Sequence, residues 1–571
     1  MSVVPATVGY QHVVAAGHEL AAQAAFEVLE AGGNAVDAGV AAVLSLGVLY
    51  SDQVSIAGVA PMLIYSAETR QLITIDGLGG WPASLDVDDF IARHNGTIPL
   101  GVRRTVIPAA PAAVIKALEL FGTMRFADVA ERAAQYAERG FARHPVMLEY
   151  VAQYADCYRE FPDNVDIWLP GGEVPPPGSL LVQPDLGRTL RYLIDEDRAA
   201  GRREAGLAAV RSAFYAGDLA SAILRHQREH DGMLSESDLQ RFDVRLLPTE
   251  QRTLHFGGRD VVVHSCGAWS QGPIMLEALS MLQHLNLEAM EYGSSAYFHT
   301  VAEVLKLALA DREGYLGDPD FVPVPVTDLI SASYGYQRSR AVDPRRATPG
   351  MPAPGAIEGY APYLAPEVVR TAPERLPADT SIVTVIDQRG NAICITPSDT
   401  SWDTPVVPGT GLAISSRGQQ SWAVKGHPSC LAPGKRPRLT PNPCFAQVPG
   451  EWIMPFGTPG GDQQVQANVQ MLLSHLQFGM PLQDAIEAPR LITHSQPDSF
   501  APHACTPGRV TIEGRVDAAV VAGMAERGHQ MEHLADWTHA VAGLCAVRKD
   551  LRTGQMVGGA DPRRMSRAIG W

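Results

Sequence analysis

Apolar positions near the start of the chain recur at roughly helical spacing. They do so between Glu19 and Glu30, and the run AGG that follows ends the pattern, which predicts a first helix. A second helix is expected to begin at Asn34, whose side chain can cap it. Asp37 stands in the first turn of that helix, where a carboxylate favours the helix dipole. Small residues follow, so we expect the two helices to pack closely on each other or on a sheet.

Strand patterns occur in three further places. Residues 61–76 contain two apolar runs joined by a polar turn, which indicates a hairpin. A second strand signal covers residues 259–265. Residues 380–396 hold two apolar runs on either side of a turn with glycine, a pattern typical of a buried hairpin. The chain therefore combines hairpins with helices, as in an α/β protein.

Helical patterns fill much of the remaining sequence, over most of 108–240 and again over 273–287 and 296–312. The pattern stops at residues 343–379. This segment carries eight prolines and scattered large apolar residues, and it shows no helical periodicity. We expect it to be a long extended or mobile segment.

The composition indicates a soluble globular protein and limits its partners. The 571 residues are 46% hydrophobic and 19% charged, which excludes general disorder. Lys and Arg number 46 against 62 Asp and Glu, a formal charge of −16, so nucleic acid is not an expected partner. Seven cysteines without a C-x-x-C pair predict reduced thiols. No signal-peptide pattern or membrane-spanning run is found, and we expect a cytoplasmic protein without membrane contact.

Several common kinds of site are excluded by inspection. The sequence has no G-x-S-x-G, H-E-x-x-H or G-x-x-x-x-G-K-[ST] motif, which argues against a conventional serine hydrolase, a zinc protease or a P-loop enzyme. The histidines are scattered, so no metal site is expected.

The remaining candidate is Thr380, a hydroxyl that stands at the start of a predicted buried strand and after the proline-rich segment. In an N-terminal-nucleophile (Ntn) hydrolase the chain cuts itself before such a residue. The new α-amine, with a pKa near 8, can then accept the hydroxyl proton. On spacing alone, the simpler interpretation, a strand that begins after a loop, fits better.

Five sequence blocks change this balance, because together and in this order they resemble the γ-glutamyltransferase family, also called γ-glutamyltranspeptidase or glutathione hydrolase. The resemblance covers nearly the whole chain. The blocks are EAGGNAVDA at 30–38, TSIVTVID at 380–387 with GNA at 390–392, KRP at 435–437, GTPGG at 457–461 and GADPRR at 559–564.

The resemblance implies a four-layer αββα sandwich of the Ntn-hydrolase type, made as a proenzyme. Cleavage between Asp379 and Thr380 would give a large subunit, 1–379, with the proline-rich tail 343–379, and a small subunit, 380–571. The two would remain one intertwined heterodimer, which further assembly could enlarge. Thr380 would be the nucleophile, Ser398 its hydroxyl partner and Thr400 a substrate-binding residue.

The same resemblance assigns the oxyanion hole to the backbone N–H groups of Gly460 and Gly461. Glycine suits this task because a tight turn can aim two amides at one developing charge without a Cβ in the way. No metal or organic cofactor is expected, since the chain itself would supply nucleophile, base and oxyanion donors.

The sequence departs from the family at the clamp that holds a γ-glutamyl group. Leu78 stands at the position of the arginine that binds the α-carboxylate, and Gln419 or Gln420 at that of the aspartate that binds the α-amine. The paired serines of the family are replaced by Leu439 and Thr440. Each lost charge-assisted hydrogen bond is worth about 1.5–3 kcal/mol, so an unmodified γ-glutamyl donor should bind poorly.

Other groups offer a new acyl site. Arg417 lies where the family has a glutamine near the substrate, and its guanidinium could bind the carboxylate of a small acidic amide, such as an oxamate-like or dicarboxylic monoamide. The alternative is an exposed, salt-bridged arginine. Trp402, Trp422 and Tyr363 could instead line an apolar acyl pocket, although bulky aromatic residues are more often core.

Three hypotheses follow. The first is a self-processing Ntn amidohydrolase of this family that acts on a small-molecule amide with a non-standard acyl group. The second is a genuine γ-glutamyltransferase or glutathione hydrolase with replacement contacts. The third is a non-processing binding or scaffold protein, which the retention of nucleophile and oxyanion glycines together argues against.

Overall fold

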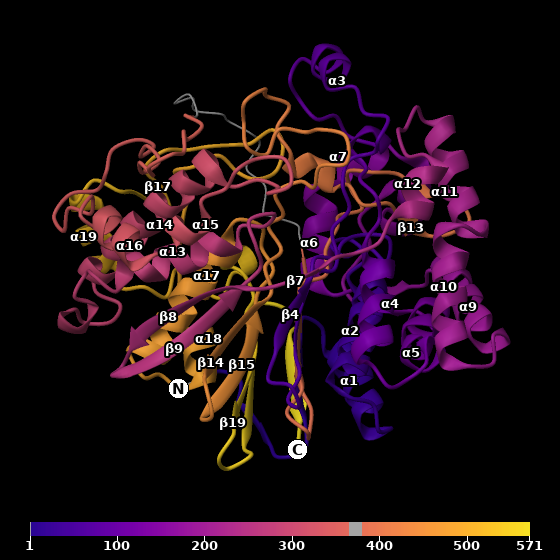
Figure 1. Cartoon of the computed structure of the whole chain (residues 1–571), viewed down its shortest axis with the longest axis horizontal. Coiled ribbons are helices and arrows are strands. Elements are labelled where there is room, and N and C mark those ends of the chain that lie inside the picture. Colours follow the sequence, from indigo (N-terminus) through magenta and orange to yellow (C-terminus); the bar gives the residue numbers. More distant parts are fainter. Residues whose placement is uncertain (1, 365–379) are drawn as a thin grey trace.

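Two antiparallel seven-stranded sheets lie face to face, and helices cover the outer side of each (Figure 1). The computed structural model describes residues 2–364 and 380–571. Strands β10 and β11 of one sheet contact β15 of the other, which places the two sheets at the centre of the molecule. The architecture is the expected αββα sandwich.

Both sheets combine strands from the two halves of the sequence. In order, the first sheet holds β1 (Thr7–Gly9), β20 (Met556–Ala560), β19 (Cys545–Asp550), β15 (Trp452–Gly457), β14 (Cys444–Val448), β9 (Arg259–Ser265) and β8 (Glu250–Phe256). The second holds β21 (Arg567–Gly570), β2 (Val13–Ala16), β10 (Val383–Ile386), β11 (Ala392–Ile395), β3 (Met62–Tyr65), β4 (Leu72–Ile75) and β7 (Leu246–Leu247).

The two outer layers are helical. The layer on the second sheet consists mainly of α1 (Glu19–Glu30), α2 (Ala35–Leu49), α4 (Ala110–Phe121), α5 (Phe126–Arg139), α9 (Pro184–Ala199) and α10 (Arg203–Tyr215). The layer on the first sheet is built from α13 (Gly272–Leu282), α14 (Ser295–Tyr315), α16 (Ala332–Ser339), α17 (Gln463–Leu472) and α18 (Leu482–Glu487).

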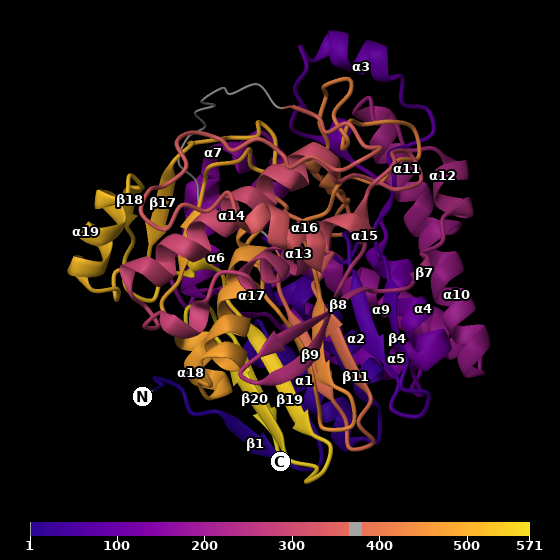
Figure 2. The same ribbon diagram turned by 60° about the vertical axis from the view of Figure 1, so that its left-hand side comes forward.

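Smaller elements decorate this frame. Figure 2 shows β17 (Arg509–Ile512), β18 (Gln530–His533) and α19 (Ala518–Glu526) at the outer edge beside α14, where β16 (Leu491–Thr493) completes a three-stranded sheet. The other helices are α3 (Val87–Arg93), α6 (Pro145–Gln153), α7 (Ala155–Arg159), α8 (Pro162–Trp168), α11 (Asp218–Glu229), α12 (Glu236–Arg241) and α15 (Val326–Leu329). Two short pairs remain, β5 (Phe141–Ala142) with β6 (Leu180–Leu181) and β12 (Val406–Val407) with β13 (Leu412–Ala413).

Helix α2 begins as the sequence predicts. The Asn34 side chain accepts hydrogen bonds from the amides of Val36 and Asp37, and the Asp37 carboxylate accepts one from the Asn34 amide, which is a complete capping box. Every residue of α2 is buried, between the strands β10 and β11 and the helix α5. This buried helix therefore packs directly against β10, the strand that follows the predicted nucleophile Thr380.

The two predicted hairpins are also confirmed. Strands β10 and β11 pair antiparallel with Val383 opposite Ile395, and β3 and β4 pair with Met62 opposite Ile75. The helix predicted over 273–287 ends earlier, at Leu282. After Leu282 the chain forms tighter turns, in which the amides of His284 and Leu285 donate to carbonyls three residues earlier, and Asn286 then adopts a left-handed backbone with φ of 44°.

Residues 343–364 form neither a helix nor a strand and follow the surface of α14. The Gly355 amide donates to the Asp311 carboxylate at 2.6 Å, and Tyr363 donates to the Gly314 carbonyl at 2.9 Å. The remainder of the proline-rich segment, with the predicted cleavage residue Asp379, lies outside the described residues.

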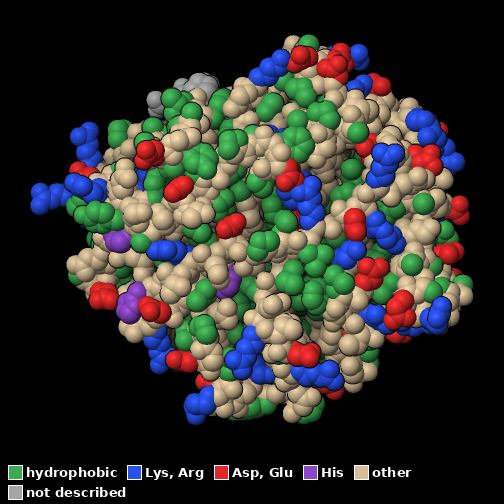
Figure 3. Space-filling view, viewed as in Figure 1, with side chains coloured by type: hydrophobic (Ala, Val, Ile, Leu, Met, Phe, Trp, Pro, Cys, Tyr) green, Lys and Arg blue, Asp and Glu red, His purple; other side chains and the backbone are tan. Residues whose placement is uncertain are grey.

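Figure 3 shows acidic and basic side chains interspersed over the face in view. Within the described ranges, one stretch, Arg203–Glu229, is long and apolar enough to cross a membrane by length and composition, and half of its apolar window is buried in the protein. It comprises α10 and α11, and core helices of soluble proteins meet the same test, so this is weak evidence.

Candidate active site

Thr380 lies three residues before β10, completely buried. Its backbone adopts a left-handed conformation with φ of 69°, which is uncommon for a β-branched residue and marks local strain. Its amide donates to the Gln53 carbonyl at 3.3 Å. Its hydroxyl oxygen is 2.8 Å from the Ser398 hydroxyl and 3.4 Å from the Gln464 amide nitrogen. The Thr380 hydroxyl therefore lies in the interior of the protein, next to the polar side chains of Ser398 and Gln464.

Ser398 reaches Thr380 from the end of β11. Its amide donates to the Val59 carbonyl at 2.9 Å, so the loop that contains Gly58 fixes the serine backbone. A Cβ on Gly58 would lie 2.3 Å from the Ser398 carbonyl oxygen. Only glycine permits the two loops to approach this closely.

Arg417 is buried behind the Ser398 hydroxyl, on a short 3-10 helix, Arg417–Gln420. Its Nη2 donates to Ser398 Oγ at 2.5 Å, and its Nε lies 3.4 Å from the Asp399 carboxylate. The alternative of an exposed, salt-bridged arginine is thus wrong about exposure, because the loops around Ser398 and Ser416 enclose the guanidinium, although Arg417 does form an ion pair, with Asp399. Whether Arg417 also binds a substrate carboxylate stays a prediction.

Asp399 balances this buried cation. Its carboxylate accepts hydrogen bonds from Ser415 Oγ at 2.7 Å, from the Ser416 amide at 2.9 Å and from Ser416 Oγ at 3.1 Å. Burial raises the pKa of the Asp399 carboxyl to about 6, and the charge of Arg417 and these donors oppose the rise. Asp399 is therefore ionised at neutral pH and protonated in mild acid.

Gly460 and Gly461 form the turn between β15 and α17, with φ of 116° and 55°. A Cβ on Gly461 would lie 3.0 Å from the Phe500 ring, so a side chain is excluded by conformation and by space. Across residues 2–364 and 380–571, neither glycine amide donates a hydrogen bond to the protein. Backbone donors of this kind, in a turn that leads into a helix, can stabilise an oxyanion.

The sequence matches the family model for Gamma-glutamyltranspeptidase over residues 21–571. The chain belongs to this family. It is 26% identical over 568 residues to the glutathione hydrolase-like YwrD proenzyme of Bacillus subtilis, a match that covers 99% of each chain. It is 27% identical over 565 residues to the oxamate amidohydrolase proenzyme of Klebsiella pneumoniae, covering 97% of this chain and 98% of that one.

Solved structures share the fold of this chain. Two structures of LmbA2991 superimpose with a TM-score of 0.93 at 34% identity, and all of each chain is covered. The cephalosporin acylase of Bacillus halodurans has a TM-score of 0.84 at 26% identity and covers all of this chain and 98% of its own. The protein is an amidohydrolase-like enzyme of the family with the fold of these relatives.

The residues predicted to stand at the positions of the glutamyl clamp are neutral. Leu78 is 2% exposed and packs in the apolar layer between the sheets with Trp269 and Leu439. Gln420 Nε2 donates to Thr440 Oγ1 at 2.7 Å, and the Thr440 amide donates back to Gln420 Oε1 at 3.3 Å. These side chains are therefore engaged with each other and with the core.

Other predicted residues are divided between separate surroundings. Thr400 donates its hydroxyl to Asp403 at 2.8 Å, and Asp403 pairs with Arg104. Trp422 is stacked between His427 and His503, and Tyr363 lies against the same His427, whereas Trp402 stacks on Tyr154. The three aromatic residues thus do not form one wall, and Trp422 and Tyr363 share a cluster from which Trp402 is absent.

Three residues around Thr380 were not predicted from the sequence. The backbone carbonyl of Gln53 accepts a hydrogen bond from the Thr380 amide. The Gln53 side chain accepts one from Arg564 Nη1 at 2.9 Å. Asp399 neutralises Arg417, and Gln464 reaches the Thr380 hydroxyl. The GADPRR block carried a signal for Arg564, but no motif distinguishes Gln53 or Gln464 from other buried glutamines.

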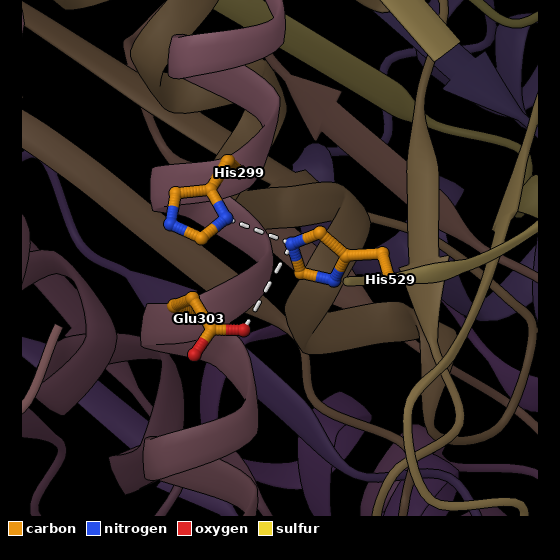
Figure 4. Close-up of side chains that lie close together, drawn as sticks. All are labelled: His299, Glu303 and His529. Atoms are coloured by element: carbon orange, nitrogen blue, oxygen red, sulfur yellow. Dashed lines mark hydrogen bonds and ion pairs between the residues drawn. The ribbon is translucent and has the colours of Figure 1, made fainter. Parts of the chain in front are cut away.

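A second polar cluster lies on α14, where His299 and Glu303 meet His529 (Figure 4). His299 Nδ1 is 2.8 Å from His529 Nε2, and Glu303 is 3.9 Å from the same nitrogen. Lys306 donates to Glu303 at 2.7 Å and lies 3.5 Å from His529 Nδ1, while His299 Nε2 contacts the Asp343 carbonyl at 2.7 Å. The lysine ammonium already supplies the cation, so the geometry is that of a hydrogen-bond chain between α14 and residue 343, and we assign no metal to it.

Proposed function

We propose that this protein is a self-processing Ntn amidohydrolase in which Thr380 forms an acyl-enzyme. The observation that carries the proposal is the buried Thr380 hydroxyl, which lies within hydrogen-bond distance of Ser398, just after β11, and of Gln464 on α17. The proenzyme names of the YwrD protein and of oxamate amidohydrolase support processing in this family.

Self-cleavage would begin at the same hydroxyl. Thr380 Oγ1 attacks the carbonyl carbon of Asp379, the peptide C–N bond breaks, and the nitrogen becomes the Thr380 α-amine. Water then hydrolyses the resulting ester, which restores the hydroxyl and leaves a carboxylate on Asp379. Strands β10 and β11 pair with β2 and β3 from the other fragment, so the two products would remain joined as a heterodimer.

The mature site would then use the amine that cleavage creates. An α-amine with a pKa near 8 is partly neutral at physiological pH and can accept the Thr380 hydroxyl proton. The hydroxyl attacks the amide carbon of the substrate, and the oxyanion forms beside the amides of Gly460 and Gly461. The amine proton passes to the leaving nitrogen, and water or an amine acceptor releases the acyl group.

The acyl group is proposed to lack the charged head of a γ-glutamyl residue. A glutamyl group brings an α-ammonium and an α-carboxylate, which would meet Leu78 and the Gln420–Thr440 pair, all neutral. Arg417 is the buried cation adjacent to Ser398 and remains our candidate for a substrate carboxylate. This favours a small amide, with or without a carboxylate, over glutathione.

Two other functions remain to be separated by experiment. Glutathione hydrolysis is suggested by the glutathione hydrolase names of several relatives, and it requires Thr380-dependent release of glutamate from γ-glutamyl-p-nitroanilide. A non-processing binding protein would leave the chain intact.

The test is the intact mass of the purified protein under denaturing conditions, with Thr380→Ala as the matched control. We expect two fragments from the parent, the smaller beginning at Thr380, and one full-length chain from the variant. A cleaved Thr380→Ala chain would refute the nucleophile assignment. The processed enzyme is then compared on oxamate, a dicarboxylic monoamide and γ-glutamyl-p-nitroanilide, and faster turnover of the last would favour glutathione hydrolysis.

A further inference from the structure

Gln464 is a buried glutamine whose side chain links the nucleophile to the loop before β14. It is the second residue of α17 and is fully buried. Its Oε1 accepts a hydrogen bond from the Asn442 amide at 3.1 Å, and its Nε2 lies 3.4 Å from Thr380 Oγ1. Because a backbone N–H can only donate, the Asn442 contact fixes which end of the Gln464 amide is oxygen. The NH₂ group must therefore face the threonine oxygen.

We propose that Gln464 is a catalytic residue that stabilises negative charge on Thr380 Oγ1 by donating an N–H to it. The proposal rests on the proposed function. As the hydroxyl proton leaves, Oγ1 becomes more negative before its bond to the acyl carbon is complete, and it becomes negative again when that bond breaks. A donor fixed at this oxygen lowers the energy of both steps. The glycine amides act on the other oxygen, the one derived from the carbonyl.

The length of the contact supports a role in the transition state. At 3.4 Å it is longer than the usual 2.9–3.0 Å of an N–H···O bond, so it contributes little to the resting enzyme. A bond that shortens as charge develops stabilises the transition state more than the ground state, which is the condition for raising the rate. The same contact would assist self-cleavage, because that reaction uses the same oxygen.

Gln470, on the same helix, is an example of a buried glutamine with a purely structural role. Gln470 donates to the Leu491 carbonyl at 2.9 Å and accepts from the Leu491 amide at 3.0 Å, so it joins α17 to β16 through backbone groups alone. Both glutamines are buried on α17, but only Gln464 of the two reaches a reactive atom. Gln470→Ala is therefore the matched control.

The test compares Gln464→Ala, Gln464→Glu and Gln470→Ala with the parent. Self-cleavage is followed by fragment formation after cell-free synthesis, which needs no substrate. Acylation is followed by Thr380-dependent release of p-nitrophenolate from p-nitrophenyl acetate. Loss of one oxyanion donor in other enzymes costs about 10²–10³ in rate. For this longer contact we expect Gln464→Ala to lower kcat by about 10- to 100-fold with little change in KM, and to slow self-cleavage.

Gln464→Glu keeps the shape but replaces the donor by a carboxylate at neutral pH. Its rate relative to the parent should rise as pH falls, because a protonated carboxyl can donate again. Equal losses in Gln464→Ala and Gln470→Ala, or a Gln464→Ala rate within twofold of the parent, would overturn the proposal. If Gln464→Ala does not fold, a relative rate of Gln464→Glu that is independent of pH overturns it instead. A parent that neither cleaves nor acylates at Thr380 would refute the proposed function itself.

Discussion

The buried pair of Arg417 and Asp399 offers a sharp test of how the site is held together. The side chains of Arg417 and Asp399 are 0% and 1% exposed, so neither charge is compensated by water. Removing one partner of such a buried pair costs about 3–5 kcal/mol, because the other charge is left unpaired. Arg417→Gln retains a donor for Ser398 but leaves Asp399 without a cation.

The size of this effect should depend on pH. Burial already raises the pKa of Asp399 to about 6, so the stability associated with its neutral form is lost as pH rises through about 6. Without Arg417 this pKa rises further, and the variant continues to lose stability at pH values where the parent no longer does, by about 1.4 kcal/mol per unit. We expect a loss of about 3–5 kcal/mol at pH 8 and a much smaller one at pH 5.

The measurement is chemical denaturation at pH 5 and pH 8 in an uncleaved Thr380→Ala background, which keeps one covalent chain. Arg417→Gln combined with Asp399→Asn removes both charges and should recover most of the loss. Arg93→Gln is the control, since the Arg93–Asp89 pair is exposed and such pairs contribute about 0–1 kcal/mol. If Arg417→Gln is as stable as Arg93→Gln at pH 8, the reasoning fails.

Three further results are expected. Gly58→Ala places a Cβ 2.3 Å from the Ser398 carbonyl, and self-cleavage should slow by about tenfold or more, which corresponds to about 1.4 kcal/mol of barrier; fragment formation at the parent rate would contradict this. Asp37→Ala removes the carboxylate that accepts hydrogen bonds from the amides of Asn34, Thr123 and Met124. We expect it to lower the free energy of unfolding by about 2–4 kcal/mol. The control is Asp86→Ala at an exposed helix cap, which should cost about 1 kcal/mol. Burial lowers the pKa values of His18 and His427 to about 4 and of His539 to about 3. As the pH falls, these three histidines therefore become protonated in the unfolded chain before they do so in the folded protein. Below pH 6.5 the free energy of unfolding should decrease by up to about 4 kcal/mol per pH unit for the three together. Denaturation midpoints that do not change between pH 7 and pH 5 would refute this.

Short-range sequence patterns were sufficient to predict several of the helices and hairpins of the fold. The cap at Asn34, the hairpin around Gly390 and the helix of α1 depend on neighbours within a few residues, so they were predicted with nearly correct limits. The end of α13 was not, because the residues after Leu282 permit but do not require the tighter turns and the left-handed Asn286 that follow the helix.

The surroundings of each site residue were harder to predict from the sequence. Family resemblance placed Thr380 and Ser398 as partners, and their hydroxyls lie 2.8 Å apart. It could not show that Arg417 is buried, because its burial results from loops that come from distant parts of the sequence. Gln464 carried no local signal either, since its role depends on a contact with Thr380 across 84 residues.

The family blocks outside the catalytic residues acquire a physical meaning from the structure. Arg436 of the KRP block pairs with Asp76 at 2.9 Å and with Asp318 at 2.7 Å, and Arg438 pairs with Glu313 at 2.6 Å. Every acidic partner lies before the proposed cleavage site and every arginine after it.

These ion pairs are buried, so they are difficult to replace by water once formed. Arg564 of the GADPRR block adds a hydrogen bond between the same two parts of the chain. It donates to the Gln53 side chain, and the Gln53 carbonyl accepts a hydrogen bond from the Thr380 amide. The arginines after residue 380 thus join the two proposed fragments close to Thr380, where a nucleophile would have to remain fixed after cleavage of its peptide bond. Loss of these junctions would loosen the position of Thr380, while the pairing of β10 with β2 and of β11 with β3 would still hold the two proposed fragments together.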